Sequence, residues 1–421
     1  MKPENLRTAL AAAIASGAMD GENPTIVLYD LDAFRARIRE LVTELPGARH
    51  ALAVKANPLA ALLTEARALG LGAEVASRAE LEHALRIGFD RSVIVFDSPA
   101  KTVGELRRAL EAGVHLNLDN LQEVERVFSI LGEAGPSRGI GLRVNPTVGP
   151  GRIEETSTAT AHSKFGVTLD EHRDEILQAF GRHRWLTGLH VHVGSQGCSL
   201  EQMALGVRRV LDLARSVNER AGAARIRQVD IGGGLTFRYR DSDPLYSVRD
   251  YARALERLCP ELFTSGYDVI TEFGRWVNAP TGVAITRVEY TKIAGGRRIA
   301  IIHVGADLFL RMVHLPDSYY HRISVFDATG AVKEGPLEVQ DVAGPLCFSG
   351  DLLARERSLP RLEPGDYVVI HDVGAYTLSM WSRYNSRQAP AVYGFEELPG
   401  GPVTLKLLKP EETIDDVLRF W

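Results

Sequence analysis

The first two thirds of the chain repeat one alternation, and this feature constrains the fold most: short runs rich in valine and isoleucine are followed by longer stretches with helical spacing of apolar residues. Strands that are apolar along their whole length are buried on both faces, in a parallel sheet covered by helices. Eight such units in about 250 residues fit a closed (β/α)8 barrel better than an open doubly wound sheet. The eight runs are 50–54, 72–76, 92–97, 115–118, 139–144, 188–193, 229–231 and 268–272.

The texture of the chain changes after about residue 280. Before it, apolar residues at i, i+3 and i+4 predict helices over 79–87, 103–112, 121–131 and 200–221. After it, predicted strands follow one another with turns and few helices, at 283–293, 298–304, 337–342, 367–371 and 403–407. The sequence therefore predicts an α/β protein of two domains. A TIM-like barrel would span 26–280, and a mostly antiparallel β domain 281–421, together with 1–25.

Composition excludes two classes of partner. A net charge of -5, without a lysine and arginine stripe, gives no footprint for nucleic acid. No apolar run reaches the roughly 18 residues of a membrane span. The stretch 10–18 is Ala-rich, and we interpret it as a surface helix ending near Gly17 rather than a signal-peptide core. The three widely spaced cysteines fit no zinc pattern, so we expect free thiols and a cytoplasmic location.

The C-terminal ends of the predicted barrel strands carry polar residues, and barrels place their chemistry at those ends. The first run leads into Lys55, although only eight of the 49 basic residues are lysines. A lysine amine desolvated in an apolar pocket can attack an aldehyde, which an arginine cannot do. The alternative is a lysine whose stem is buried while its amine reaches solvent.

Two histidines end the sixth run. His190 and His192 lie on one face of a strand, because side chains alternate there. They could bind a metal ion, but no aspartate, glutamate or cysteine completes a ligand set at a matching spacing. We therefore expect no metal. A flat imidazole packed on an aromatic cofactor is another use for such a residue.

The seventh and eighth runs end in three glycines and a carboxylate. Gly232, Gly233 and Gly234 let backbone N–H groups approach an anion, and barrels commonly bind phosphate after strands seven and eight. Glu272 is costly to bury unless it is paired, and a protonated pyridine nitrogen is a suitable partner. The glycines could instead form a plain turn, and Glu272 could pair with an arginine of the protein.

Six motifs occur in order between about residues 25 and 390: AVKAN, KFG, HVHVGSQ, DIGGGL, GPLC..GD and GAY...YNSR. This series resembles the decarboxylases of the alanine-racemase fold (fold type III), above all diaminopimelate decarboxylase and more distantly ornithine and arginine decarboxylases. The resemblance implies a decarboxylase of a small amino-acid substrate with pyridoxal 5'-phosphate (PLP) as its cofactor, bound by the barrel. It also implies a homodimer with the active site at the subunit interface.

The resemblance assigns roles to individual residues. Lys55 would carry PLP as a Schiff base, and Cys347 of the second subunit would return a proton to the substrate carbon after CO2 leaves. His192 would stack on the ring, and Glu272 would pair with its nitrogen, which makes the ring an electron sink. The other cofactor-binding residues implied are Arg143 near the ring oxygen, Ser195, Gly232, Gly233 and Gly234 at the phosphate, Gly274 and Arg275 at its edge, and Tyr376 at phosphate or substrate.

The sequence departs from the family at the distal end of the substrate. In diaminopimelate and ornithine decarboxylases, the residue after the reactive cysteine is acidic and pairs with a distal ammonium. Here it is Phe348, which cannot replace that charge. Arg275 and Arg311 match the family's arginines for a distal carboxylate, whereas the expected tyrosine is Leu315. With Tyr376, these residues predict a substrate with a distal carboxylate and no free distal amine, such as a diamino-acid conjugate of siderophore or other specialised metabolism.

Several alternatives remain beside this prediction. One is a genuine meso-diaminopimelate decarboxylase of lysine biosynthesis. A PLP-dependent racemase shares the barrel and the lysine, but racemases of this fold place an arginine where this chain has Glu272. A non-catalytic PLP-binding barrel would lack the β domain and the Cys347 loop. An aldolase that uses Lys55 on a substrate carbonyl would leave the three glycines and Glu272 unexplained.

Overall fold

The computed structural model describes residues 3–132, 135–136, 138–397 and 403–421. The chain divides into two compact units. The barrel unit comprises Arg37–Arg238 and Pro244–Trp276, and the β unit comprises Met1–Ala36, Tyr239–Asp243 and Val277–Trp421. The sequence predicts domain boundaries for the barrel at residues 26 and 280. The N-terminal boundary differs in the structure because strand β1 (Thr25–Asp30) pairs with strands of the β unit and not with the barrel.

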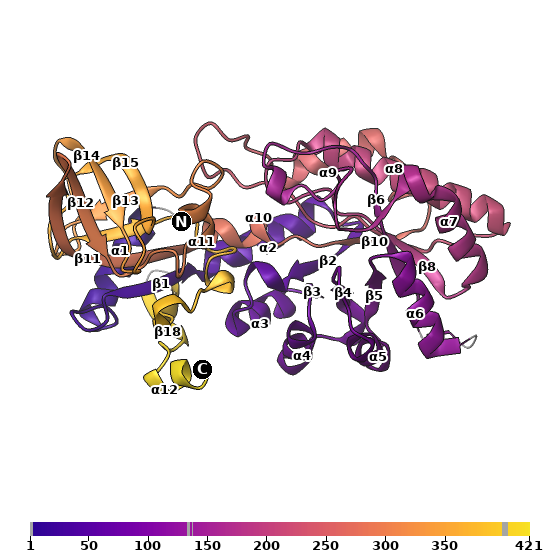
Figure 1. Ribbon diagram of the computed structural model, residues 1–421, viewed down its shortest axis with the longest axis horizontal. Coiled ribbons are helices and arrows are strands. Elements are labelled where there is room, and N and C mark those ends of the chain that lie inside the picture. The colour runs from indigo at the N-terminus through magenta and orange to yellow at the C-terminus, as the bar shows by residue number, and fades with distance from the viewer. Residues whose placement is uncertain (1–2, 133–134, 137, 398–402) are drawn as a thin grey trace. The chain divides into compact units, whose positions relative to one another are not determined.

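Eight parallel strands of the barrel unit close into one sheet (Figure 1). Their spatial order is β5-β4-β3-β2-β10-β9-β8-β6, and β5 also pairs with β6, which closes the circle. The predicted (β/α)8 barrel is thereby confirmed, and each of the eight predicted runs overlaps one strand. The strands are β2 (Ala48–Ala53), β3 (Gly72–Val75), β4 (Ile94–Asp97), β5 (His115–Leu118), β6 (Ile140–Asn145), β8 (Leu186–His190), β9 (Gln228–Asp230) and β10 (Asp268–Thr271), with the short β7 (Val167–Thr168) beside β6.

Helices alternate with these strands, and the sequence sets their limits through capping residues. Ser77, Thr102, Asn120 and Ser199 each accept a hydrogen bond from the backbone N–H three residues on, which satisfies a donor that the first turn leaves open. The helices are α2 (Leu31–Glu44), α3 (Ala60–Ala68), α4 (Arg78–Ile87), α5 (Val103–Ala112), α6 (Leu121–Leu131), α7 (Leu169–Arg182), α8 (Leu200–Ala221), α9 (Val248–Leu258) and α10 (Arg275–Asn278).

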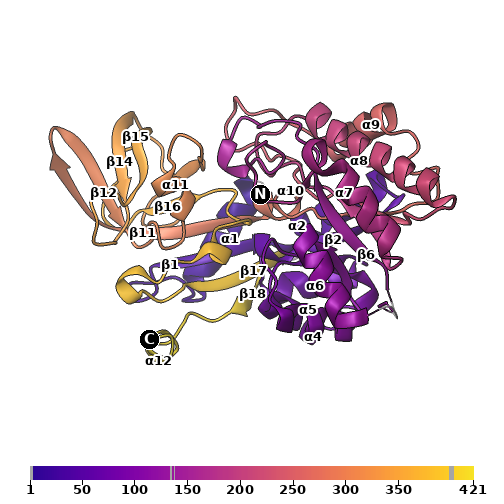
Figure 2. The ribbon, with the colours of Figure 1, turned by 45° about the vertical axis from the view of Figure 1, so that its right-hand side comes forward.

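The β unit is built on a second, mostly antiparallel sheet (Figure 2). Its main path is β15-β14-β12-β11-β1-β17-β18, with β16 and β13 joined through β11. These strands are β11 (Gly282–Ala294), β12 (Arg297–Ile302), β13 (Ile323–Phe326), β14 (Leu337–Ala343), β15 (Leu352–Pro360), β16 (Tyr367–Ile370), β17 (Ala391–Glu397) and β18 (Val403–Lys409). Helices α11 (Leu310–His314) and α12 (Ile414–Leu418) belong to the same unit.

The N-terminal helix α1 (Pro3–Ala15) ends before the limit expected from the sequence, and one of its faces is part of the core. Leu6, Ala9, Leu10 and Ala13 are at most 3% exposed and pack in one apolar cluster with side chains of β1, β11, β16 and β17. This face explains why the stretch is Ala-rich, since small side chains let a helix approach a sheet closely. Among the described helices, none has the length and apolar character needed to cross a membrane.

Candidate active site

The barrel unit gathers ten of the predicted site residues at or just beyond the C-terminal ends of its strands. Lys55 lies in the 3-10 turn Val54–Ala56 that follows β2. Glu272 follows β10, and Arg275 is the first residue of α10. The others are Arg143 on β6, His192 and Ser195 after β8, Gly232, Gly233 and Gly234 after β9, and Gly274 after β10.

Lys55 is the one predicted nucleophile at this end of the barrel. Its Nζ lies 2.6 Å from Oε1 of Glu74, a fully buried residue of β3, while 39% of the lysine side chain is exposed. Burial raises the pKa of Glu74, Lys55 opposes this effect, and the nearby carboxylates of Glu272 and Asp97 add to it. Glu74 thus fixes the direction of the amine and can exchange a proton with it.

The three glycines form a tight turn against neighbouring backbone. Gly232 and Gly234 have φ of 67° and 106°, which L-residues rarely adopt. A Cβ at Gly233 would lie 2.2 Å from the carbonyl oxygen of Glu272, so this turn tolerates no side chain. The Gly233 N–H donates to Nδ1 of His192 at 3.1 Å. Such a turn can present backbone N–H groups to a phosphate.

Two further polar side chains border this turn. Arg275, which is 5% exposed, donates through Nη2 to Oγ of Ser195 at 3.1 Å. Burial, together with the positive charge of Arg143, lowers the pKa of His192 to about 3, so its ring is neutral at pH 7. A neutral imidazole and a cation beside a glycine turn are suited to an aromatic ring that carries a phosphate.

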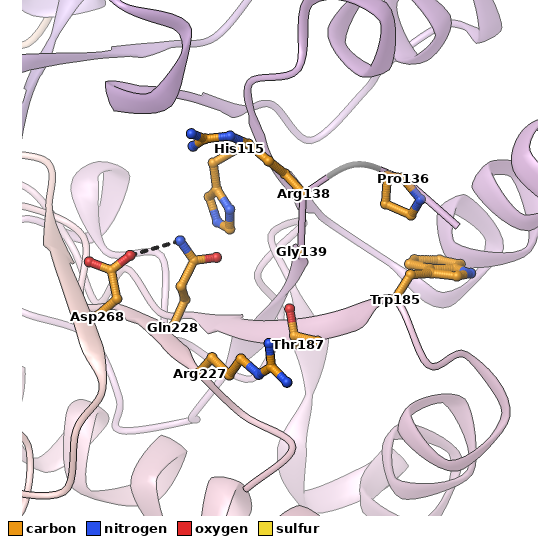
Figure 3. A pocket seen from close by; sticks show the side chains of 9 residues that line it. All are labelled: His115, Pro136, Arg138, Gly139, Trp185, Thr187, Arg227, Gln228 and Asp268. Carbon is orange, nitrogen blue, oxygen red and sulfur yellow. Dashed lines mark hydrogen bonds between the residues drawn. The ribbon is translucent and has the colours of Figure 1, made fainter. Parts of the chain in front are cut away.

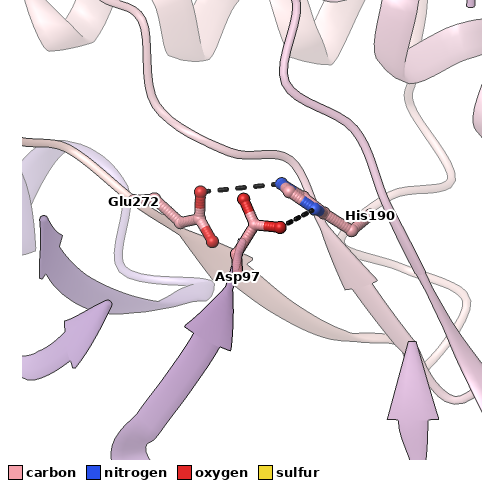
Figure 4. A group of neighbouring side chains, drawn as sticks. All are labelled: Asp97, His190 and Glu272. Atoms are coloured by element: carbon pink, nitrogen blue, oxygen red, sulfur yellow. Dashed lines mark ion pairs between the residues drawn. The ribbon is translucent and has the colours of Figure 1, made fainter. Parts of the chain in front are cut away.

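Glu272 belongs to a buried group of charges that the sequence did not reveal (Figure 4). His190 lies between Glu272 and Asp97, with Nε2 3.6 Å from Oε2 of the first and Nδ1 3.7 Å from Oδ1 of the second. Arg143 pairs with Asp97 at 3.0 Å. Oε1 of Glu272 is buried and receives no hydrogen bond within the described ranges. That atom is therefore suited to a donor on a ligand.

Sequence reasoning missed several buried acids of the barrel: Glu74, Asp97, Asp119 and Asp230. Asp97 ends the third predicted run, and its place at the C-terminal end of a barrel strand is the signal that could have revealed it. Glu74 lies inside the predicted run 72–76, and nothing in the local pattern distinguishes it from the other residues of that strand. The sequence predicted no metal, whereas the ligand atoms of Asp97, His190 and Glu272 lie within 4.8 Å of one another, close enough for one ion to contact all three.

The β unit carries the other predicted residues, and a loop holds Cys347 exposed. The Cys347 N–H donates to Oδ1 of Asn385 at 2.8 Å, and its carbonyl accepts a hydrogen bond from the Tyr384 hydroxyl at 3.1 Å. Asp351 closes the loop, because its two carboxylate oxygens accept the N–H groups of Ala306 and Leu346. The GPLC..GD and YNSR motifs therefore share one task, which is to fix the backbone around Cys347.

Aromatic side chains surround Phe348. Its ring is parallel to that of His314, with centroids 5.8 Å apart, and the ring of Tyr384 meets it edge-on at 6.1 Å. The guanidinium of Arg311 lies over the ring of Tyr376 at 4.7 Å. The loop thus presents a thiol, apolar rings and a nearby cation. Its one carboxylate, that of Asp351, is used by the backbone.

A pocket of about 430 Å³ lies at the opposite end of the barrel, where the strands begin (Figure 3). Its lining includes His115, Thr187, Gln228 and Asp268, and the Gln228 amide donates to Asp268 at 3.0 Å. None of the predicted site residues lines it. The predicted site residues therefore lie at the other end of the barrel from this pocket, which is the end at which barrel enzymes act.

Comparison with known proteins agrees with the chemistry. Residues 31–279 match the pyridoxal binding domain of the pyridoxal-dependent decarboxylases. The chain is 36% identical to the diaminopimelate decarboxylase of Pseudomonas aeruginosa over 370 residues, which cover 86% of this chain and 85% of that protein. It is 30% identical to the diaminopimelate decarboxylase of Zymomonas mobilis, over 93% of this chain and 91% of that one.

Solved structures show the same fold. The diaminopimelate decarboxylase of Helicobacter pylori complexed with L-lysine superposes with a TM-score of 0.84 at 27% identity, covering 97% of this chain and 98% of that chain. The lysine/ornithine decarboxylase of Vibrio vulnificus complexed with cadaverine superposes with a TM-score of 0.78 at 22% identity, over 94% of this chain and 100% of that one. The second likeness concerns the fold alone.

Proposed function

This chain belongs to the pyridoxal-dependent decarboxylases, and from that premise we propose that its substrate is an amino acid with a distal carboxylate and no free distal amine. As a PLP-dependent carboxy-lyase, it replaces the α-carboxylate of an amino acid with a proton. The observation that carries the proposed substrate is that the residue after Cys347 is Phe348, where the resemblance to the family predicts an acid that binds the distal ammonium.

The residues of the barrel end fit PLP. Lys55 offers an amine for the aldehyde. The turn of Gly232, Gly233 and Gly234 carries no side chains, so a phosphate can approach its backbone closely, although the first two N–H groups donate to Asp230 and His192. Oε1 of Glu272 is the buried acceptor that a protonated ring nitrogen requires. These three features lie at one end of one barrel, which supports the roles we propose for Lys55, the glycines and Glu272.

PLP, when bound, supplies an electron sink for the pair of electrons left when the carbon–carboxylate bond breaks. The protein groups bind, orient and move protons around it. The Lys55 amine would hold the cofactor aldehyde, and Glu74, which accepts a hydrogen bond from that amine, would take and return its proton. Glu272 would keep the ring nitrogen protonated, and His192 and Arg143 would hold the ring. Cys347 delivers a proton to the substrate carbon from which CO2 has left.

The distal pocket is proposed from charge and size. An ammonium brought next to Phe348 would lose its hydration and gain no carboxylate, because Asp351 already accepts two backbone N–H groups. Arg275 and Arg311 are cations suited to a distal carboxylate. We propose that both bind it and that the rings of Phe348 and Tyr376 cover the chain between the two ends of the substrate.

The test is CO2 release from a panel of meso-diaminopimelate, lysine, ornithine, arginine, glutamate and N-acylated diaminopropionates. We expect N-acylated acids with a distal carboxylate to have the highest kcat/KM. Turnover of meso-diaminopimelate with kcat on the order of 10 per second, typical of a dedicated enzyme, would overturn the proposed substrate. In that case the second candidate holds, a genuine meso-diaminopimelate decarboxylase, which the names of the relatives favour.

We also propose that the active enzyme is a homodimer in which Cys347 serves the barrel of the second subunit. The exposure of this thiol on a well-fixed loop supports the idea. The test mixes two inactive variants, Lys55→Ala and Cys347→Ala. If each subunit completes the other's site, about a quarter of the sites regain both residues after subunits exchange at random. No recovery after demonstrated exchange would contradict the shared site.

A further inference from the structure

Asp97 and His190 are buried ionisable side chains that have no role in the proposed function. Asp97 is the last residue of β4 and His190 is the last residue of β8. Both therefore lie at the C-terminal ends of their strands, and Figure 4 shows their side chains grouped with that of Glu272. The side chains of Asp97, His190 and Glu272 are 5%, 0% and 2% exposed, so water does not screen the charges among them.

The geometry determines which form of His190 fits. Each ring nitrogen faces a carboxylate oxygen, Nδ1 that of Asp97 at 3.7 Å and Nε2 that of Glu272 at 3.6 Å. A neutral imidazole would point a lone pair at one of these carboxylates, whereas an imidazolium has an N–H on both sides. At these distances neither nitrogen has a hydrogen-bond partner in the part of the chain that the structure describes. The two carboxylates therefore favour the imidazolium through their charge.

The acids around the ring support the same form. Burial opposes the charge on His190, but the carboxylates of Asp97, Glu272 and Asp230 outweigh it and raise the pKa of His190 to about 9. Asp230 on β9 contributes least of the three. Burial and the charge of Glu272 raise the pKa of Asp230 itself. The ring nitrogens thus face the two acids that remain charged.

The cations nearby are already balanced or neutral. Arg143 on β6 pairs with the carboxylate at the end of β4, and Lys55 pairs with the buried glutamate of β3. Burial lowers the pKa of His115 to about 4 and that of His192 to about 3, so both rings are uncharged at pH 7. Arg143 thus shares Asp97 with His190, and it also lies 3.8 Å from a carboxylate oxygen of Asp119.

We infer that Asp97 and His190 are positioning residues that act through Glu272. Asp97 holds His190 as an imidazolium, and the imidazolium holds Glu272 as a carboxylate. A positive charge beside Oε2 makes Glu272 a weaker base, so a proton shared between Glu272 and the cofactor's ring nitrogen stays on the nitrogen. The inference rests on the proposed function, since that function assigns Glu272 to the ring nitrogen.

The first experiment follows His190 itself in the full-length protein, with and without PLP, by NMR of ¹⁵N-labelled histidine side chains. The His190→Gln variant assigns the signal. We expect an imidazolium at pH 7.5 in the wild type, and a titration midpoint about two units lower in Asp97→Asn. The matched control is Asp119→Asn, which removes a carboxylate 3.8 Å from Arg143 without touching the ring of His190. Its midpoint should stay within about half a unit of the wild-type value.

The second experiment follows the proton on the cofactor, with PLP ¹⁵N-labelled in its ring. We expect a protonated ring nitrogen in the wild type, loss of that proton in Asp97→Asn and His190→Gln, and its return in Asp97→Glu. In the two variants kcat should fall by at least about tenfold while KM changes little, because the interaction lost acts on the reacting state.

The outcomes separate the inference from the proposed function. If PLP does not bind, or forms no Schiff base with Lys55, the proposed function fails whatever form His190 takes. If PLP binds and the wild type releases CO2, but His190 is neutral at pH 7.5 or both variants keep the ring proton, the inference alone fails. Binding of one Zn²⁺ per chain to the PLP-loaded wild type, lost in Asp97→Asn, would also overturn it, because an imidazolium cannot ligate a metal.

Discussion

The end of the barrel and the loop that carries Cys347 depart from their family pattern to different extents. In the barrel, Lys55 and Glu272 stand at the positions that the family motifs assign them, among buried ionised groups that depend on one another. In the loop the cysteine is kept, but Phe348 stands where the resemblance predicts an acid, and Leu315 after α11 stands where it predicts a tyrosine. Both side chains are at least partly exposed.

This difference has a physical reason. Removing one partner from a buried ion pair typically costs about 3–5 kcal/mol, because it leaves a charge without a counterion. A substitution at an exposed position usually changes stability by less than about 0.5 kcal/mol. The cofactor end is therefore constrained by the folding of the barrel, whereas the distal end of the substrate site can change at little cost. The contrast predicts that substitutions in the barrel abolish activity, whereas substitutions in the loop change the substrate preference.

The largest effect is expected for Lys55→Ala in the barrel. Loss of the amine removes the covalent attachment of PLP, and kcat should fall by at least about 10³-fold. Borohydride treatment followed by mass spectrometry should find no cofactor on the variant. The control is Lys164→Ala, which alters an exposed lysine of the KFG motif and should retain the label on Lys55. A variant without Lys55 that keeps a tenth of the wild-type rate would contradict its assigned role.

The buried charges should also lower the free energy of unfolding at alkaline pH. The pKa of His190 is raised from 6.5 to about 9, so its contribution is complete below pH 6.5 and is lost as pH rises through about 9. The contribution is on the order of 3 kcal/mol. Urea unfolding at pH 7 and pH 10 should show a larger loss of stability in the wild type than in His190→Gln. Equal losses in the two proteins would show that His190 is not charged in the folded state.

In the loop, Phe348→Glu should redirect the enzyme. A carboxylate at this position can pair with a distal ammonium, so kcat/KM for meso-diaminopimelate should rise about 10²-fold relative to that for N-acylated substrates. Phe348→Gln provides a similar polar shape without the charge and should change the ratio much less. If both variants give the same ratio, ring size and not charge excludes the distal amine.

The smallest effect is expected for Leu315→Tyr, which restores the family's tyrosine at an exposed position. One additional neutral hydrogen bond to a distal carboxylate contributes about 1 kcal/mol, which is roughly a fivefold change in KM. Steady-state kinetics with the preferred substrate measure this change. A Leu315→Phe variant separates the hydroxyl from the ring, and an equal effect in that variant would rule out the hydrogen bond.

The sequence was sufficient for the barrel because each strand and helix carries its own local signal. The limits predicted for α5, α6 and α8 coincide with those observed, since Thr102, Asn120 and Ser199 cap helices that end at a glycine. The motif at the end of β9 likewise led directly to the glycine turn. These features depend on neighbours within a few residues along the chain, so they are visible without a structure.

The Asp97, His190 and Glu272 group was not visible, because its members end three strands, β4, β8 and β10, that meet only when the sheet closes. The spacing of these residues along the chain does not show that they are in contact, so the sequence predicted no partner for His190. The position of strand β1 was not predicted for a related reason. Its partners are β11 and β17, far along the chain, and the sequence assigned its residues to the barrel.

The pairing of β1 has a consequence for how the protein is made. Thr25 is paired with Thr286, and Ile26 with Ala391, so the strand leaves the ribosome long before either partner exists. The barrel residues are synthesised after β1 and before β11, so the barrel can fold first. During that time the apolar faces of α1 and β1 remain exposed to solvent. Nascent chains halted before β11 should therefore bind chaperones through their first thirty residues, and release them as the last strands appear.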